Sequence, residues 1–194
     1  MTTKRPYTMT ARKEAADGTR LRILQATFEL WFEMRSVEIV LADIAERAAV
    51  SPQSVLRHFG SKEGLFDATF AFAELHVDEE RETPVGDVER AVDVIMSHYE
   101  TRGDAVLRLL AQEFWDDHAH RITDNGRRMH RQWVEAVFAP QLGARSLEGR
   151  ETLTDLLLIA TDVYTWKLLR RDRALSRAET TRRILHLVRA VLTE

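Results

Sequence analysis

The sequence predicts an all-α fold, because apolar residues recur at helical spacing along nearly the whole chain and the alternation typical of strands is almost absent. Only eight glycines and four prolines occur in 194 residues, and most of them lie where a helix can begin or end. Apolar residues make up 44% of the chain and charged residues 30%, which is ordinary for a folded domain with an apolar core.

The N-terminal third contains closely spaced start and stop signals for short helices. Ser51 can cap a helix, and Pro52 fits its first turn, where a missing N–H has no effect. Gly60 ends that helix and Ser61 opens the next. We expect helices over residues 19–34, 41–48, 52–58 and 61–82.

Helical signals continue to the end of the chain. Thr83 and Pro84 repeat the cap-and-proline signal and mark the best domain boundary, and Gly103 separates two helices. Residues 176–179 (SRAE) form a capping box. We expect helices over residues 84–101, 104–118, 121–139, 150–171 and 176–192, with a loop over 140–149.

The last two of these helices are apolar on most of their circumference, so most of each must be buried. Two terminal helices of a small domain cannot both be central. We therefore expect a two-fold homodimer through residues of about 150–192, and the alternative is a thicker monomeric core.

Several classes of protein are excluded or disfavoured. The chain has no cysteine, which excludes disulfides, thiolate nucleophiles and cysteine-bound zinc. The first 20 residues lack an apolar run, and no window approaches the roughly 18 apolar residues of a membrane span. No nucleophile elbow, phosphate-binding glycine loop or HExxH motif occurs. We expect a cytoplasmic protein that is not an enzyme, uses no cofactor and contacts no membrane.

Two short helices joined by a turn of about three residues, 41–48 and 52–58, form a helix-turn-helix, whose second helix can enter the DNA major groove. The apolar side of this second helix, with Val55 and Phe59, can pack inward. Its polar side carries residue types that read bases or bind phosphates. The Leu56 side chain can make an apolar contact with DNA, for example with a thymine methyl. The candidate DNA-binding residues are Ser51, Gln53, Ser54, Leu56, Arg57, His58 and Lys62.

The charge is distributed unevenly, although the net charge is only −3. Residues 1–25 carry six Lys and Arg against two Asp and Glu, whereas residues 74–93 carry two against eight. This asymmetry indicates a basic end that meets phosphates. A basic tail without a partner is the alternative.

Residues 19–66 resemble the DNA-binding domain of the tetracycline-repressor (TetR) family of transcriptional regulators. The resemblance is carried by FELWF, ADIAERA, Val50-Ser51, RHF and SKE at residues 28–32, 42–48, 50–51, 57–59 and 61–63. It implies a palindromic DNA operator, and a divergent C-terminal body that binds a small-molecule effector and dimerises. It covers about a quarter of the chain.

Four positions depart from the family pattern. Arg35 and Ala49 stand where family members usually have glycine, Val40 replaces a capping threonine that touches phosphate, and Leu56 replaces a tyrosine that packs on the DNA backbone. Two phosphate contacts are thereby lost. We expect the basic arm to compensate by reaching a minor groove.

By the same resemblance, an effector pocket is expected among the helices of about 84–171. Large aromatic residues with one polar group recur in apolar pockets, so Trp115 and Trp133 are the strongest candidates and the ligand is expected to be flat or lipophilic. The alternative is that these residues are ordinary core. The candidate lining residues are Met96, Tyr99, Leu110, Phe114, Trp115, Met129, Trp133, Phe138 and Tyr164.

Two further charged clusters are expected to be solvated helix surface. Residues 116–120 (DDHAH) have the composition of a metal site, but only two ligands would share a helix face, so no metal is expected. Six arginines between residues 170 and 183 surround a helix C-terminus, where cations are favourable.

Together these observations predict three segments: a basic N-terminal arm (1–18), a helix-turn-helix domain (19–66) and an effector-binding and dimerisation domain (67–194). The expected function is that of a ligand-responsive repressor that binds DNA as a homodimer. The alternatives are a helical protein-interaction module with decayed DNA contacts and a constitutive DNA binder without a ligand.

Overall fold

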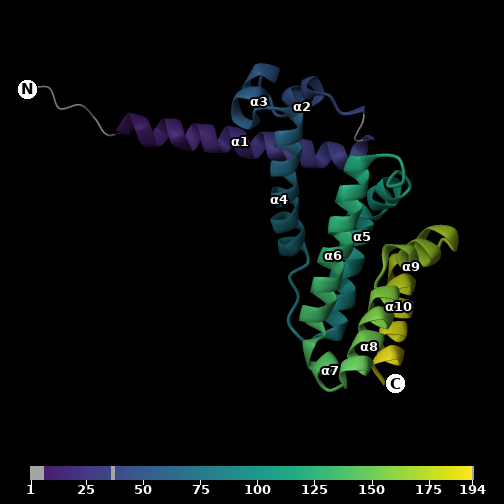
Figure 1. Ribbon diagram of the computed structural model, residues 1–194. Coiled ribbons are helices and arrows are strands. Elements are labelled where there is room, and N and C mark those ends of the chain that lie inside the picture. Colours follow the sequence, from purple (N-terminus) through teal and green to yellow (C-terminus); the bar gives the residue numbers. More distant parts are fainter. Residues whose placement is uncertain (1–6, 36–37, 194) are drawn as a thin grey trace, which may run out of the picture. The chain divides into compact units, whose positions relative to one another are not determined.

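The computed structural model describes residues 7–35 and 38–193 (Figure 1). The described residues are helical almost throughout and contain no strand, so the predicted all-α class is confirmed. They divide into two compact units, with the division between Leu75 and His76 inside one helix, α4. Residues 1–6 of the predicted arm, which include Lys4 and Arg5, lie outside the described residues.

The first unit comprises α1 (Tyr7–Glu33), α2 (Leu41–Arg47), α3 (Pro52–Phe59) and the first part of α4 (Lys62–Glu80). Aromatic rings at its centre meet edge to face, which is the favourable geometry for such pairs. The Phe28 and Phe32 ring centroids are 5.0 Å apart, and those of Trp31 and Phe66 are 5.5 Å apart. Ile44 and Val55 bring α2 and α3 into this core.

The start of α1 differs from the sequence prediction. The helix begins at Tyr7 and not at Thr19, so residues 7–18, expected as an arm, continue the helix. Residues 11–16 (ARKEAA) consist of strong helix formers, and their propensity outweighs the cost of about 1 kcal/mol for one glycine at Gly18.

The second unit surrounds its own apolar core. Its helices α5 and α6 lie side by side, and α8 and α10 pack along them (Figure 1). The core includes Ile95, Leu157, Trp166 and Ile184, all at most 1% exposed. The elements are α5 (Val88–Leu110), α6 (Asp117–Val137), α7 (Ala139–Gly143), α8 (Leu147–Ala160), α9 (Val163–Lys167), a π-helical turn η2 (Leu168–Asp172) and α10 (Arg177–Thr193).

Several predicted boundaries in this unit were wrong. Helix α5 continues through Gly103, because the missing side chain makes room for Trp166: a Cβ there would lie 2.5 Å from its ring. The predicted loop 140–149 contains α7, with Pro140 in its first turn. The predicted helix 150–171 is interrupted before α9, where the Asp162 carboxylate accepts the Tyr164 N–H at 2.7 Å.

Helix α6 also begins at a cap that the sequence analysis placed within a helix. The Asp116 carboxylate accepts the N–H groups of His118 and Ala119 at 2.9 and 3.3 Å. Residues 111–116 therefore form turns, and α6 starts at Asp117.

Candidate nucleic-acid interface

Helix α3 is bounded by the two signals that the sequence predicted. The Ser51 hydroxyl accepts the Ser54 N–H at 3.1 Å, and Pro52 occupies the first position. The helix ends at Gly60, whose φ of +79° is unfavourable for residues with a Cβ. These caps confine α3 to eight residues, Pro52–Phe59, and keep it separate from α4.

The turn between α2 and α3 places Ala49 in the left-handed region. Its φ is 53°, a conformation that costs a non-glycine residue about 1–2 kcal/mol. The turn is closed by the Val50 N–H, which donates to the Ala45 carbonyl at 2.9 Å. The geometry shows why glycine suits this position and why alanine is strained there.

At the N-terminus of α2, a hydrogen bond to Asp43 partly replaces the missing threonine cap. Val40 has no side-chain acceptor, but its own N–H donates to Asp43 Oδ2 at 3.1 Å. Asp43 thus supplies half of a capping box and also places a carboxylate in the first turn, where negative charge is favourable.

The outer face of α3 is polar and linked by side-chain hydrogen bonds. Ser51 Oγ lies 3.1 Å from Ser54 Oγ, and Arg57 Nη2 donates to Ser54 Oγ at 3.3 Å. On the opposite side, Val55 is completely buried. Of the seven predicted DNA-binding residues, four are exposed and three are half-buried: Ser51, Gln53, Leu56 and Arg57, then Ser54, His58 and Lys62.

Three basic residues near α3 have contacts within the unit. Arg20 Nη1 donates to the His58 carbonyl at 3.3 Å, and Arg22 Nε donates to the Ala48 carbonyl at 3.4 Å. Both guanidinium groups lie at helix C-termini, where they interact favourably with the helix dipole. The Lys62 ammonium lies 5.2 Å from the Phe66 ring centroid. Part of the positive charge counted at the basic end therefore stabilises the domain.

Helices α1 and α2 are joined by an ion pair. Arg47 Nη1 and Nη2 donate to the two Glu33 carboxylate oxygens at 2.7 and 2.6 Å. The hydrogen bonds from Arg47 lower the pKa of Glu33, and the same bonds raise the pKa of Arg47.

A short, capped helix with a polar outer face, packed on two further helices, defines a helix-turn-helix domain of the kind that reads DNA. Residues 23–69 match the family model described as bacterial regulatory proteins, tetR family. The match covers this domain, about a quarter of the chain, and the chain as a whole shares the fold of the solved transcriptional regulators described next.

Solved structures share the fold over most of the chain. A tetR-family transcriptional regulator from Streptomyces coelicolor matches with a TM-score of 0.64 at 17% identity, covering 89% of this chain and 81% of the other. A transcriptional regulator from Rhodococcus sp. Rha1 matches with a TM-score of 0.61 at 20% identity, covering 90% and 96%. No curated protein matches the chain.

The structure separates the predicted effector-lining residues into two groups. Met96, Tyr99, Leu110, Met129 and Phe138 are buried, and Trp133 is half-buried. By contrast, Phe114, Trp115 and Tyr164 are 91%, 57% and 55% exposed. The structure does not bring these three exposed side chains together with the buried group.

Polar residues that the sequence analysis did not single out form a hydrogen-bonded cluster in the second unit. The Glu80 carboxylate accepts hydrogen bonds from Arg102 through Nε, at 2.9 Å, and through Nη2. His98 Nδ1 lies 3.3 Å from Glu80 Oε2. Desolvation opposes ionisation of Glu80, but the hydrogen bonds from Arg102 and His98 outweigh it and hold the pKa of Glu80 well below its ordinary value.

Two more buried groups complete this interior set. The Tyr99 hydroxyl donates to the Thr161 carbonyl at 3.0 Å, and burial raises the pKa of Tyr99 above its ordinary value. His130 Nε2 lies 3.1 Å from Thr161 Oγ1. Because the Thr161 hydroxyl donates to the Leu157 carbonyl at 2.7 Å, Nε2 is the donor to Thr161. His98 and His130 gave no sequence signal of burial, because each fits an ordinary helix pattern, whereas Tyr99 was among the predicted lining residues.

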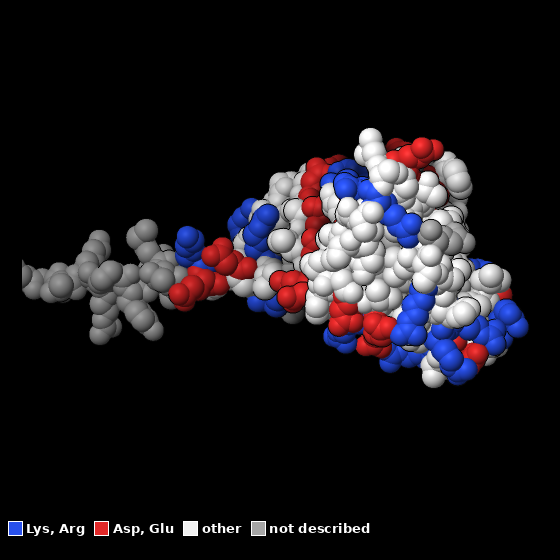
Figure 2. Space-filling model, turned by 90° about the horizontal axis from the view of Figure 1, so that it is seen from below, with Lys and Arg blue, Asp and Glu red and all other residues white. Residues whose placement is uncertain are grey.

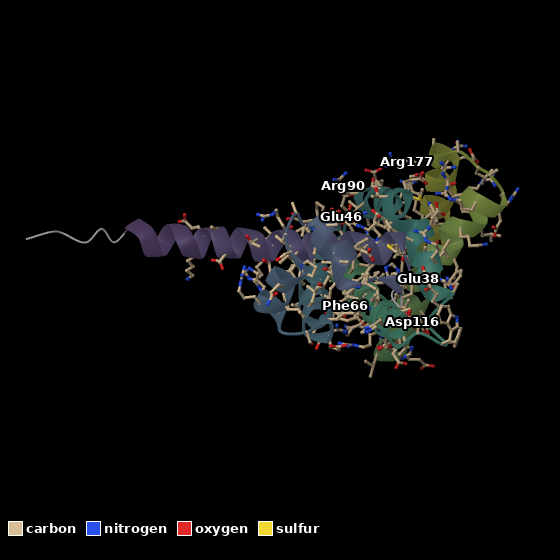
Figure 3. All side chains as sticks on the ribbon, turned by 90° about the horizontal axis from the view of Figure 1, so that it is seen from above. Glu38, Glu46, Phe66, Arg90, Asp116 and Arg177 are labelled. Carbon is tan, nitrogen blue, oxygen red and sulfur yellow. The ribbon has the colours of Figure 1, made fainter. Side chains whose placement is uncertain are left out.

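The arginines of residues 170–183 are largely ion-paired. Figure 2 shows one face of the molecule, on which Lys and Arg side chains lie beside Asp and Glu. Arg170 pairs with Glu100 at 2.9 Å and Arg171 with Asp104 at 2.8 Å. Arg90 and Arg177, labelled in Figure 3, both reach Asp93, at 3.1 and 3.2 Å. These contacts fasten η2 and α10 to α5.

None of the helices in residues 7–35 and 38–193 is long and apolar enough to cross a bilayer.

Proposed function

We propose that this chain is a ligand-responsive repressor that binds a palindromic DNA operator as a homodimer in the cytoplasm. The observation that carries the proposal is the outer face of α3, where Ser51, Ser54 and Arg57 are aligned by hydrogen bonds. These side chains lie on a helix held rigidly by two caps and by the buried Val55.

In this proposal α3 enters the major groove. Arg57 suits guanine, Gln53 suits adenine, and Leu56 contacts a thymine methyl. Ser51, Ser54, His58 and Lys62 contact bases or phosphates near the helix ends. In a two-fold dimer, the two copies of α3 would read half-sites about 34–36 Å apart.

The dimer is proposed to form through α8 and α10, which pack against each other in the second unit. Large apolar side chains remain exposed in this region: Ile159 is 62% exposed and Leu187 is 38% exposed. A symmetric partner would remove them from water. An effector bound in the second unit would act by its different affinity for DNA-competent and DNA-incompetent arrangements of the dimer.

Selection of binding sites from random duplex DNA tests the proposal. The full chain should enrich an inverted repeat. Enrichment of a single half-site would contradict the dimeric operator. If no sequence is enriched at low salt, the chain is not a sequence-specific DNA reader, and a protein-interaction role with decayed DNA contacts becomes the better account.

A further inference from the structure

The second unit contains a buried guanidinium whose desolvation is not fully compensated: burial lowers the pKa of Arg81 and outweighs Glu80 and Asp78, which act to raise it. Arg81 follows the last residue of α4 and is only 9% exposed. Its Nε has no hydrogen-bond partner, and within the part of the chain that the structure describes no carboxylate forms an ion pair with it. The neighbouring Glu80 carboxylate is already occupied by Arg102 and His98.

The backbone around Arg81 is fixed in place. Trp133 Nε1 donates to the Arg81 carbonyl at 3.0 Å, which ties the end of α4 to α6. The position of the guanidinium is therefore not that of a loosely held surface side chain. A buried charge without a partner costs several kcal/mol, and proteins normally pair such charges.

Three of the groups close enough to interact with the Arg81 charge are uncharged: His98, Tyr99 and His130. Burial and then the Arg81 charge lower the pKa of His98 to about 4 and that of His130 to about 3. Burial keeps the pKa of Tyr99 high, so its phenol is neutral. Glu80 is already paired with Arg102, and the other nearby acid, Asp78, is exposed, so the buried guanidinium has no buried carboxylate of its own. One positive charge matches one negative charge of a ligand.

The surroundings favour a ligand whose remaining part is apolar. The Trp133 ring stacks on the His130 ring, with centroids 5.7 Å apart and an interplanar angle of 14°. The apolar core of the unit includes Met96 and Phe138, and Trp133 packs against it.

We propose that Arg81, surrounded by His98, Tyr99 and His130, binds the carboxylate of a hydrophobic monocarboxylic acid. This inference rests on the proposed function, because it names the chemical class of the effector. The acid would supply the missing partner of Arg81 and would bind directly beside the C-terminal end of α4, a helix that begins in the DNA-binding unit.

The test uses the full chain and two acids, benzoate and octanoate. Each has a neutral control, benzamide and octanol, and phenyl phosphate represents a dianion with the same ring. Calorimetric titration should show binding of at least one acid, with the matched neutral compound and phenyl phosphate at least about tenfold weaker, as expected for a charge-assisted hydrogen bond. Equal binding of acid and neutral control, tighter binding of phenyl phosphate, or no binding of either acid would overturn the proposal.

Variants of Arg81 assign the site. Arg81→Met should weaken acid binding about 10- to 100-fold, and Arg81→Lys should restore part of it because it keeps the charge. Arg90→Gln is the matched control, since it removes an arginine outside the cluster that already has a carboxylate partner, Asp93. Circular dichroism shows whether each variant is folded. If Arg81→Met does not fold, the comparison of acid binding between Arg81→Lys and the parent protein still tests the assignment. Unchanged acid binding in both Arg81 variants would contradict the assignment.

Failure of this inference is distinguishable from failure of the proposed function. If the protein enriches an inverted repeat but binds neither acid, Arg81 is not an effector site, while the DNA-binding proposal stands. If an acid binds through Arg81 but does not release DNA, the site is real and the proposed regulation is wrong.

Discussion

Arg57 Nη2 donates to Ser54 Oγ at 3.3 Å, one turn back along α3. The contact holds the guanidinium along the outer face of the helix in the free protein. An arginine has five N–H donors in a fixed fork, so this single bond leaves donors available for a base edge. Ser54 is in turn held by Ser51, whose hydroxyl also caps the helix. The residues that start α3 thus also orient Arg57, the proposed base-reading residue.

Ala49→Gly should stabilise the protein. Ala49 has a φ of 53°, which glycine adopts without strain, so we expect a gain of about 1 kcal/mol and a rise in Tm of about 2–4 °C. The matched control is Ala48→Gly, because Ala48 has a φ of −79° and is buried, so the same change there should destabilise. Scanning calorimetry measures both. A fall in Tm for Ala49→Gly would show that the turn is not strained.

Two glycine-to-alanine changes in helices should have opposite effects. In α5, a Cβ at Gly103 would lie 2.5 Å from the Trp166 ring, and overpacking of this kind costs about 1–3 kcal/mol. In α6, a Cβ at Gly126 meets nothing within 4 Å, so Gly126→Ala should add about 0.5–1 kcal/mol. Urea denaturation followed by tryptophan fluorescence compares them. Equal effects of the two changes would contradict the close approach of α5 and α9.

Stability should fall as the pH is lowered from about 6.5 to 4.5. In the unfolded chain His98 and His130 take up protons near the ordinary histidine pKa of about 6.5, whereas in the folded protein their pKa values are about 4 and about 3. The unfolded state therefore binds more protons in this window, and unfolding becomes easier by up to about 1.4 kcal/mol per pH unit for each histidine.

Chemical denaturation at a series of pH values measures this slope. His130→Asn removes one of the two histidine contributions, so the slope should become shallower. His186→Asn, at an exposed position on α10, is the control and should leave it unchanged. A stability that is constant between pH 6.5 and 4.5 would contradict the burial of neutral histidines.

Ile159→Glu should convert the proposed dimer to a monomer, because it places a charge at an exposed apolar position of α8 that the partner would cover. Val85→Glu is the control, since Val85 is 64% exposed but lies outside α8 and α10. Sedimentation equilibrium at micromolar concentration distinguishes the outcomes. A dimer that survives Ile159→Glu and dissociates in Val85→Glu would place the interface elsewhere.

The DNA-binding unit was more predictable than the second unit, for a physical reason. Ser51, Pro52 and Gly60 act within one turn of their own position, so their chemistry is visible in the local sequence. The start of α1 was the exception there. The start of this helix depends on the summed helix propensities of many residues, so no single residue marks it in the sequence.

The second unit depends on contacts between distant parts of the chain. Gly103 reads as a helix breaker locally, but it is a packing site for Trp166. Arg81 lies in an acidic stretch and reads as a surface charge, although folding buries it against α6. The predicted lining residues Phe114 and Trp115 show the converse: apolar chemistry favoured burial, yet they lie in the exposed turns before α6.

The central claim is that α3 reads DNA bases, and parallel site selections with the parent protein and Arg57→Ala test it most directly. Arg57→Ala should lose base preference at one symmetry-related position in each half-site, at a cost of about 1–3 kcal/mol there, while the other positions keep theirs. An identical motif with uniformly weaker binding would make Arg57 a phosphate contact only. An identical motif at unchanged affinity would contradict the claim that the outer face of α3 contacts the operator.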